Sequence, residues 1–334
     1  MAAAGGNIVR FIYTGAEGEI IPREATHITV AADCTFVRAR AFMSHPNIVE
    51  VICHDRVEKI ERAAFCGCPS LRRVIMPGVK EVEMLAFFHC PILTDVECGK
   101  LEIIEDEAFG GCKSLENIGL LSVRIAQREA FWECKALMEV KFGNELERIE
   151  EGLCSGCTSL ERITIPLKDG IITDDTVFEG CQNLRYVDLV GEAELYESIA
   201  ALHLEEWRND MNEEFHSINQ ILPDAVAGDD HGWDGQEPFV PGEKAKVIRT
   251  WIRSVLGKID HFKAEHQRIL EEATTLLELA IWKANLDETD ESQIVREGFR
   301  TMRGSLKRAR RELCITSGAS IVIKNVLPFL QLKS

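Results

Sequence analysis

The stretch AFCGCPSLRRVIMP at residues 64–77 decides the fold, because its order of Ala-Phe, Cys, Leu and Val returns along the chain as far as residue 191. The repeated Phe recurs at intervals of 22 to 24 residues, and Cys154 takes its place in one copy. A period of that length is typical of stacked coils, in which each repeat buries its apolar side against its neighbours. The sequence therefore predicts a solenoid. The Phe positions are Phe42, Phe65, Phe87, Phe109, Phe131 and Phe178.

Each copy also contains two sets of apolar residues, which are expected to line two opposite walls of the solenoid core. A Leu is followed by two further apolar residues that alternate with variable ones, which is the period of a half-buried strand, and these strands are expected to join into a parallel sheet. A second apolar position before the next Ala-Phe predicts the opposite wall, at Ile60, Val82, Ile104, Ile149 and Ile172. The strand triplets are Ile48-Val51-Cys53, Leu71-Val74-Met76, Leu93-Val96-Cys98, Leu115-Ile118-Leu120, Leu137-Val140-Phe142, Leu160-Ile163-Ile165 and Leu184-Val187-Leu189.

One Cys per copy, three residues after the Phe, predicts a ladder of thiols inside the stack. Adjacent coils pair at about 4.8 Å, whereas a disulfide needs Cβ atoms about 3.8 Å apart, so we expect free thiols that pack as small hydrophobes. His45 replaces this Cys in an atypical first copy, and Cys154 predicts looser packing in its own copy. The ladder positions are Cys68, Cys90, Cys112, Cys134, Cys157 and Cys181.

The unit A-F-x-x-C-x-x-L-x-x-V-x-[LI]-P, seen in Ala64–Pro77 and in degraded form in Leu153–Pro166, resembles the BspA-like class of leucine-rich repeats. The resemblance covers about residues 20–191 and implies an α/β repeat solenoid with a parallel strand sheet. It does not specify a function, because the class occurs in bacterial surface adhesins and in intracellular proteins of protists and algae. Residues 200–334 are similar to the helical tail of leucine-rich repeat proteins from single-celled algae.

After Gly191 the apolar period changes to 3.6 residues, which predicts an all-α tail. We therefore divide the chain into an N-terminal lead-in at 1–19, the solenoid at 20–191, and a helical tail at 192–334. Within the tail, the Asp-, Gly- and Pro-rich segment 224–242 predicts a flexible loop.

Three amphipathic helices are expected in the tail, over about residues 198–222, over about 243–285, and from about residue 290 onward. The acidic run Asp287–Glu291 suits the N-terminus of the third helix. Each helix carries one apolar stripe, which can be buried only against the other helices, the end of the solenoid or a second chain. We expect an antiparallel coiled-coil-like bundle, with a homodimer formed through the tail as the alternative.

The outward positions of the strand sheet are the candidate partner-binding surface. No charge sign dominates there, and a solvated mixed surface is the plain alternative to a docking site. Ile52 and Ile75, on neighbouring coils, are the one indication of an apolar patch. The candidates are Glu50, Ile52, His54, Arg73, Ile75, Asp95, Glu97, Lys141, Arg162 and Tyr186, with Asn117, Gly119, Glu139, Thr164 and Asp188 as further outward positions.

The net charge of −17, from 55 acidic and 38 basic side chains, argues against nonspecific binding of nucleic acid or anionic membranes. The sequence contains no apolar run of the roughly 18 residues that a bilayer crossing needs, and its N-terminus lacks the pattern of a signal peptide. We therefore expect a cytoplasmic protein whose partners are proteins. The basic run Lys307–Arg311 resembles a nuclear-import signal, with a plain solvated helix face as the alternative.

No spacing in the sequence matches a metal site, a phosphate-binding loop or a catalytic triad, so we assign no catalytic residue, metal or cofactor. The resulting hypothesis is a noncatalytic scaffold or adaptor that binds a protein partner through the repeat sheet. The alternatives are an enzyme with a site at the junction of solenoid and tail, and a nuclear regulatory protein. A surface adhesin would need an export signal.

Overall fold

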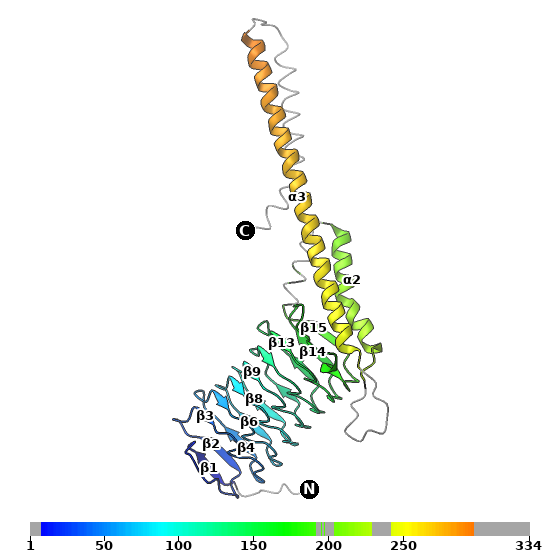
Figure 1. Ribbon diagram of the computed structural model, residues 1–334. Helices are drawn as coiled ribbons and strands as arrows, with labels where there is room; N and C mark the ends of the chain where they lie inside the picture. The colour runs from blue at the N-terminus through cyan, green and yellow to red at the C-terminus, as the bar shows by residue number, and fades with distance from the viewer. Residues whose placement is uncertain (1–7, 192–194, 196, 198–203, 229–241, 297–334) are drawn as a thin grey trace. The chain divides into compact units, whose positions relative to one another are not determined.

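The structure of the 334-residue chain is a computed structural model (Figure 1). It describes residues 8–191, 195, 197, 204–228 and 242–296, and of 284–296 it describes the backbone alone. The chain divides into two compact units. Unit 1 contains Met1–Ala200 and Asp210–Leu256, and unit 2 contains Ala201–Asn209 and Gly257–Ser334.

Unit 1 is built on parallel strands that stack coil upon coil, from blue to green in Figure 1, which confirms the predicted solenoid. One wall is a six-stranded sheet of order β1-β2-β4-β6-β8-β10, followed by a three-stranded sheet of order β12-β14-β15. These strands are β1 (Arg10–Tyr13), β2 (His27–Val30), β4 (Glu50–Ile52), β6 (Arg73–Ile75), β8 (Asp95–Glu97), β10 (Asn117–Ile118), β12 (Glu139–Lys141), β14 (Arg162–Ile165) and β15 (Tyr186–Leu189).

The opposite wall is a second parallel sheet, of order β13-β11-β9-β7-β5-β3. The apolar residues predicted for this wall are all buried, which confirms their assignment. The strands are β3 (Phe36–Val37), β5 (Lys59–Ile60), β7 (Glu81–Val82), β9 (Ile103–Ile104), β11 (Ile125–Ala126) and β13 (Arg148–Ile149).

The repeated Phe side chains from Phe42 to Phe131 form a ladder of stacked rings between the two walls, and Cys154 separates this ladder from Phe178. Ring centroids lie 4.9 Å apart from Phe42 to Phe65 and 5.7 Å apart from Phe109 to Phe131, and neighbouring rings are close to parallel. Tyr13 continues the ladder at its N-terminal end, with its ring centroid 5.0 Å from that of Phe42. The prediction that these aromatic side chains point inward is confirmed, since each is at most 1% exposed.

The ladder cysteines are free and fully buried, as predicted, and their thiols also make hydrogen bonds. The Sγ of Cys90 donates to the carbonyl of Phe65 in the preceding coil at 3.1 Å, and Cys112 donates to Phe87 in the same way. His45 fills the equivalent place in its coil, where Nε2 donates to the carbonyl of a preceding turn at 3.0 Å. A Cys or His at this position therefore supplies a donor for a buried carbonyl, which Ala could not do.

The turns between coils contain residues with left-handed backbone conformations. Gly67 and Gly111, directly before the ladder cysteines, have φ values of 70° and 72°. A ladder of glutamates stabilises the neighbouring turns: Glu61, Glu83 and Glu105 each accept a backbone N–H from the preceding coil, at 2.7 to 2.9 Å. Burial raises the pKa of the Glu105 carboxyl.

Helical segments cover the last coil within unit 1. The 3-10 turn η1 (Asp175–Phe178) lies in the coil itself, α2 (Glu205–Ile221) runs into η2 (Leu222–Asp224), and α3 spans Lys244–Arg296. The buried Lys244 donates from Nζ to the carbonyls of Leu184 at 2.7 Å and Leu222 at 3.3 Å. Burial lowers the pKa of this ammonium group.

Two ion pairs attach the first turns of α3 to the loops of the last coils. Arg253 pairs with Asp169 at 3.0 Å, and Arg249 pairs with Asp175. Trp251 is buried beside them, and its ring nitrogen donates to a carbonyl of α2 at 2.9 Å. The predicted stripe of the first tail helix is confirmed at Met211, Phe215 and Ile218, which are all buried. This part of the tail therefore packs on the solenoid.

Unit 2 contains the start of α2 and the longer part of α3, and the rings of Trp207 and Phe262 stack there at 5.1 Å. The prediction that one helix ends near residue 285 and another begins near 290 is wrong, because α3 continues unbroken to Arg296. The segment from Lys283 to Arg296 contains no Gly or Pro that would end a helix.

Some expectations concern residues outside those that the structure describes. These are the helix after Arg296, the basic run Lys307–Arg311, most of the loop at 224–242, and the first residues of the helix expected from 198.

Candidate functional site

The outward side chains of the first sheet form two rows that run along the solenoid, which together we call the strand face. Ladder pairing aligns Arg10 with His27, His27 with Glu50, Glu50 with Arg73, and Arg73 with Asp95. We call these residues the charged row. Two residues further along each strand, pairing aligns a second set, the apolar row: Ile12, Thr29, Ile52 and Ile75.

The charged row is largely neutralised by ion pairs between coils. Arg73 pairs with Glu50 at 3.8 Å, with Asp95 at 3.1 Å, and with Glu97, which follows Asp95 on β8. The hydrogen bond to Glu97 and the surrounding carboxylates raise the pKa of the Arg73 guanidinium. His27 lies 3.9 Å from Glu50. Four predicted site residues, Glu50, Arg73, Asp95 and Glu97, are therefore brought together, and three carboxylates around one guanidinium leave a formal charge of −2.

The apolar row is exposed at the N-terminal end of the sheet. Ile12 is 65% exposed and Ile52 is 37% exposed, while Ile75 is half-buried and Thr29 between them is exposed. Ile52 and Ile75 lie side by side in register, as the sequence indicated. Ile12 extends the patch by two strands, and the sequence analysis missed it because its coil lacks the Ala-Phe unit. The concentration of β-branched and aromatic residues in IVRFIY, residues 8–13, is the signal that could have revealed this strand.

The remaining predicted residues lie apart from this patch. Arg162 stacks on the ring of Tyr186, with its guanidinium carbon 4.6 Å from the ring centroid, and pairs with Asp188 at 2.6 Å. Lys141 is exposed on β12. His54 lies beyond the end of β4, where its Nε2 bonds to the carbonyl of the preceding coil's turn at 2.9 Å. Thr164 is in register with the outward residues Lys141 and Asp188, but it is only 7% exposed and is therefore not accessible to a partner.

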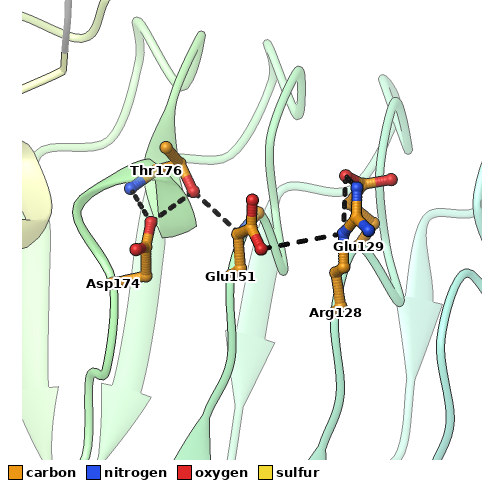
Figure 2. A network of polar contacts seen from close by, with 6 residues as sticks. Arg128, Glu129, Glu151, Asp174 and Thr176 are labelled. Carbon is orange, nitrogen blue, oxygen red and sulfur yellow. Dashed lines mark hydrogen bonds and ion pairs between the residues drawn. The ribbon is translucent and has the colours of Figure 1, made fainter.

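A polar network at the turns of three neighbouring coils is a second cluster of charged side chains, away from the strand face (Figure 2). Arg128 contacts Glu129 at 2.8 Å and Glu151 at 3.8 Å. In the next coil, Thr176 accepts the N–H of the residue after Glu151 at 3.1 Å and donates its hydroxyl to Asp174 at 2.6 Å. These bonds lower the pKa of the Asp174 carboxyl. The network links the turns of successive coils and leaves Asp174 ionised, which suits a structural role.

In the part of the chain that the structure describes, no group of three or more His, Cys, Asp and Glu side chains could hold a metal ion. No helix within it combines the length and the apolar character that a bilayer crossing requires.

Solved structures of bacterial repeat proteins are similar to this chain. A leucine-rich repeat protein of T. pallidum has 21% identity and a TM-score of 0.37, over 56% of this chain and 81% of that one. A leucine-rich cell surface protein of Faecalibacterium prausnitzii has 20% identity and a TM-score of 0.33, over 52% and 62%. A leucine-rich repeat protein of Bacteroides ovatus has 20% identity and a TM-score of 0.26, over 50% and 61%.

A comparison with curated protein sequences finds no match. The family model described as "BspA type Leucine rich repeat region" matches with six copies, over residues 35–122 and 86–199. These ranges cover the coils that carry the Phe and Cys ladders. The solenoid of this chain is therefore a BspA-type leucine-rich repeat region, and the chain belongs to the family of proteins that carry it.

Proposed function

We propose that this chain is a noncatalytic scaffold or adaptor that binds a protein partner through the strand face. The observation that carries the proposal is the apolar row, in which Ile12, Ile52 and Ile75 are aligned on β1, β4 and β6 and remain accessible. Burying one of these side chains against a partner contributes about 1–2 kcal/mol. The neighbouring ion pairs form a polar rim, which excludes water around such a centre.

The alternative of an enzyme with a site at the solenoid–tail junction would need an accessible reactive group there. Lys244 has a lowered pKa, as catalytic lysines often do. However, the residue is only 1% exposed, and its ammonium group is bound by the carbonyls of Leu184 and Leu222. These contacts favour a structural role for Lys244, and we therefore retain the noncatalytic proposal.

The helical tail is proposed to position the solenoid and to join two chains. Leu276, Leu279 and Trp282 lie within one arc of α3 and are 55–63% exposed, so a coiled-coil contact with a second copy would remove them from water. Sedimentation equilibrium of the wild type and of a Leu279→Glu, Trp282→Glu variant tests this proposal. We expect a dimer that dissociates in the variant, and a wild type that is monomeric at micromolar concentration would contradict it.

We further propose that the protein acts in the cytoplasm, where its thiols stay reduced. The nuclear alternative depends on Lys307–Arg311. A fluorescent fusion of the full chain, compared with one in which the basic residues of this run are replaced by Gln, separates the two locations.

The test of the strand face is a quantitative affinity purification from the native cell. An Ile52→Glu, Ile75→Glu variant is compared with the wild type and with Leu121→Glu, which changes an exposed apolar residue in the turn after β10. We expect specific partners to be retained by the wild type and the control and lost from the double variant. If all partners remain on a double variant with an unchanged circular dichroism spectrum, the strand face is not the binding site.

A further inference from the structure

Among the residues that the structure describes, the first strand of the solenoid is paired on one side alone. In the described residues, β1 ends the order of the first sheet, with β2 as its neighbour. The carbonyls of Val9 and Tyr13 accept N–H groups from the β2 side, at 3.1 Å from His27 and 2.8 Å from Ala31. In a parallel ladder, backbone groups alternate between the two sides of a strand. The N–H and C=O groups of Arg10 and Ile12 therefore point to the open side.

Arg10 is the single charged residue on this short edge, which lacks the other residue types by which proteins block strand addition. Residues 8–13, IVRFIY, contain no Pro, Gly, Lys or acidic residue, and all are compatible with a strand. Ile8 and Ile12 are 62% and 65% exposed. The other end of the solenoid differs, because α2 covers β15 and the side chain of Asn219 accepts the N–H of Val187 at 3.2 Å. The exposed edge of β1 is therefore a place where another strand can pair.

The two rows of the strand face define the chemistry of that strand. The charged row alternates in sign from Glu50 to Arg73 to Asp95, and each of these residues has an ion-pair partner on an adjacent strand. No ion pair joins the exposed Arg10 to another described side chain. A carboxylate directly opposite Arg10 on an added strand would give Arg10 an ion-pair partner on an adjacent strand, as Arg73 has in Glu50 and Asp95. The residue opposite Ile12 would extend the apolar row, which favours a β-branched side chain.

We propose that the open edge of β1 accepts an extended segment of a partner protein as an added strand, with an acidic residue opposite Arg10 and a β-branched residue opposite Ile12. Main-chain hydrogen bonds supply the affinity in this mode of recognition, and the two side-chain positions supply the selectivity. The inference rests on the proposed function, since the ligand is a protein, but it concerns the edge of the sheet. A second copy of this chain is a poorer occupant, because its own β1 offers another Arg10 and no carboxylate between residues 8 and 13.

The test uses two synthetic peptides with blocked ends, TVTETVT and TVTKTVT, and the full-length protein. In both strand directions, the central residue can face Arg10 while a Val, two positions away, faces Ile12. Binding is measured by fluorescence anisotropy at low ionic strength. We expect the wild type to prefer the Glu peptide by on the order of fivefold, and Arg10→Glu to prefer the Lys peptide by a similar factor.

Two further variants distinguish binding at the open edge of β1 from binding at the strand face. Ile12→Pro removes an N–H that points to the open side, while the N–H and C=O groups of residues 9, 11 and 13 still face β2, so it should weaken both peptides with little change in thermal stability. Ile52→Glu, Ile75→Glu should leave peptide binding unchanged, even where it abolishes binding of a strand-face partner.

Three results would overturn the proposal. The first is the absence of binding of TVTETVT to the wild type at about 1 mM, at which even weak strand addition is detectable. The second is an unchanged peptide preference in Arg10→Glu, which keeps the test valid where the Pro variant does not fold. The third is a wild-type dimer that dissociates in Ile12→Pro, which would identify a second copy as the occupant.

Discussion

Replacing Phe109 by Ala removes one ring from the centre of the aromatic ladder. The side chain is 0% exposed, and its ring centroid lies 5.2 Å from that of Phe87 and 5.7 Å from that of Phe131. Both neighbouring rings are held by their own coils and cannot close the gap without shifting the ladder pairing of the strands. The substitution therefore leaves a cavity that is lined by rings on two sides.

The expected cost follows from the cavity and the lost ring contacts. Truncation of a buried Phe to Ala costs about 3–5 kcal/mol in free energy of unfolding. Each of the two stacked pairs is worth about 0.5–1.5 kcal/mol beyond burial. Phe178 is a matched control: it is equally buried, but Cys154 replaces the Phe of the preceding coil. We therefore expect Phe109→Leu, which keeps most of the volume, to cost about 1–3 kcal/mol more than Phe178→Leu.

Urea unfolding followed by far-ultraviolet circular dichroism measures these differences. Because each coil contacts only its neighbours, Phe109→Ala should also broaden or split the transition, as the two halves of the solenoid lose their coupling. In thermal unfolding, the loss of about 3–5 kcal/mol in free energy of unfolding that is expected for Phe109→Ala corresponds to a decrease of roughly 6–20 °C in the midpoint. An unchanged midpoint would show that the assigned repeat register is wrong, and equal costs for the two Leu variants would show that ring stacking contributes nothing.

Three further outcomes are expected. Gly78→Ala should cost about 1–3 kcal/mol, because its Cβ would lie 2.0 Å from the carbonyl oxygen of Asp55, whereas Gly99→Ala, whose nearest contact is at 4.0 Å, should be nearly neutral in urea unfolding. Burial raises the pKa of the Cys112 thiol from 9.0 to about 12, so the folded state keeps a proton that the unfolded chain loses. Stability should therefore fall as the pH rises above 9, and at pH 8 the native thiol should resist iodoacetamide in a mass-spectrometric assay. Lys244→Ala should cost at least about 2 kcal/mol, measured by urea unfolding, because two buried carbonyls lose their donor.

The repeat is the part of the fold that could be predicted, because each coil buries the same types of side chain at equivalent positions. Phe, Cys and Leu at fixed positions are visible as a period, and the structure places them at equivalent positions in the core. The glutamate ladder was missed, although Glu61, Glu83 and Glu105 are also spaced by 22 residues. Its partners are backbone N–H groups, which have no sequence signature, so the residues looked like ordinary exposed glutamates.

The candidate site was predicted only in part, because one of its strands lies in a coil that lacks the repeated Ala-Phe unit. Ile52 and Ile75 belong to regular coils and were assigned from the strand pattern. The strand that carries Ile12 lies within residues 1–19, which the sequence analysis separated as a lead-in, because Tyr13 occupies the end of the ladder without the Ala-Phe unit. In the tail, Asp287–Glu291 has the composition of a helix start, but composition alone does not end the preceding helix. Gly and Pro are the residues that most strongly favour an end, and the segment Lys283–Arg296 contains neither.

At the N-terminal end of the solenoid, the apolar core is covered, whereas the backbone edge of β1 is accessible in the described residues. Tyr13 is 1% exposed, its ring packs on Phe42, and its hydroxyl accepts the N–H of Arg38 at 3.1 Å, so the apolar core is covered at this end. The backbone edge beside it, at Arg10 and Ile12, has no comparable cover in the described residues. An end that was merely incomplete would expose its core as well. Coverage of the core together with an accessible strand edge is instead what a site for an added strand requires, since the partner then supplies hydrogen bonds without having to complete the fold.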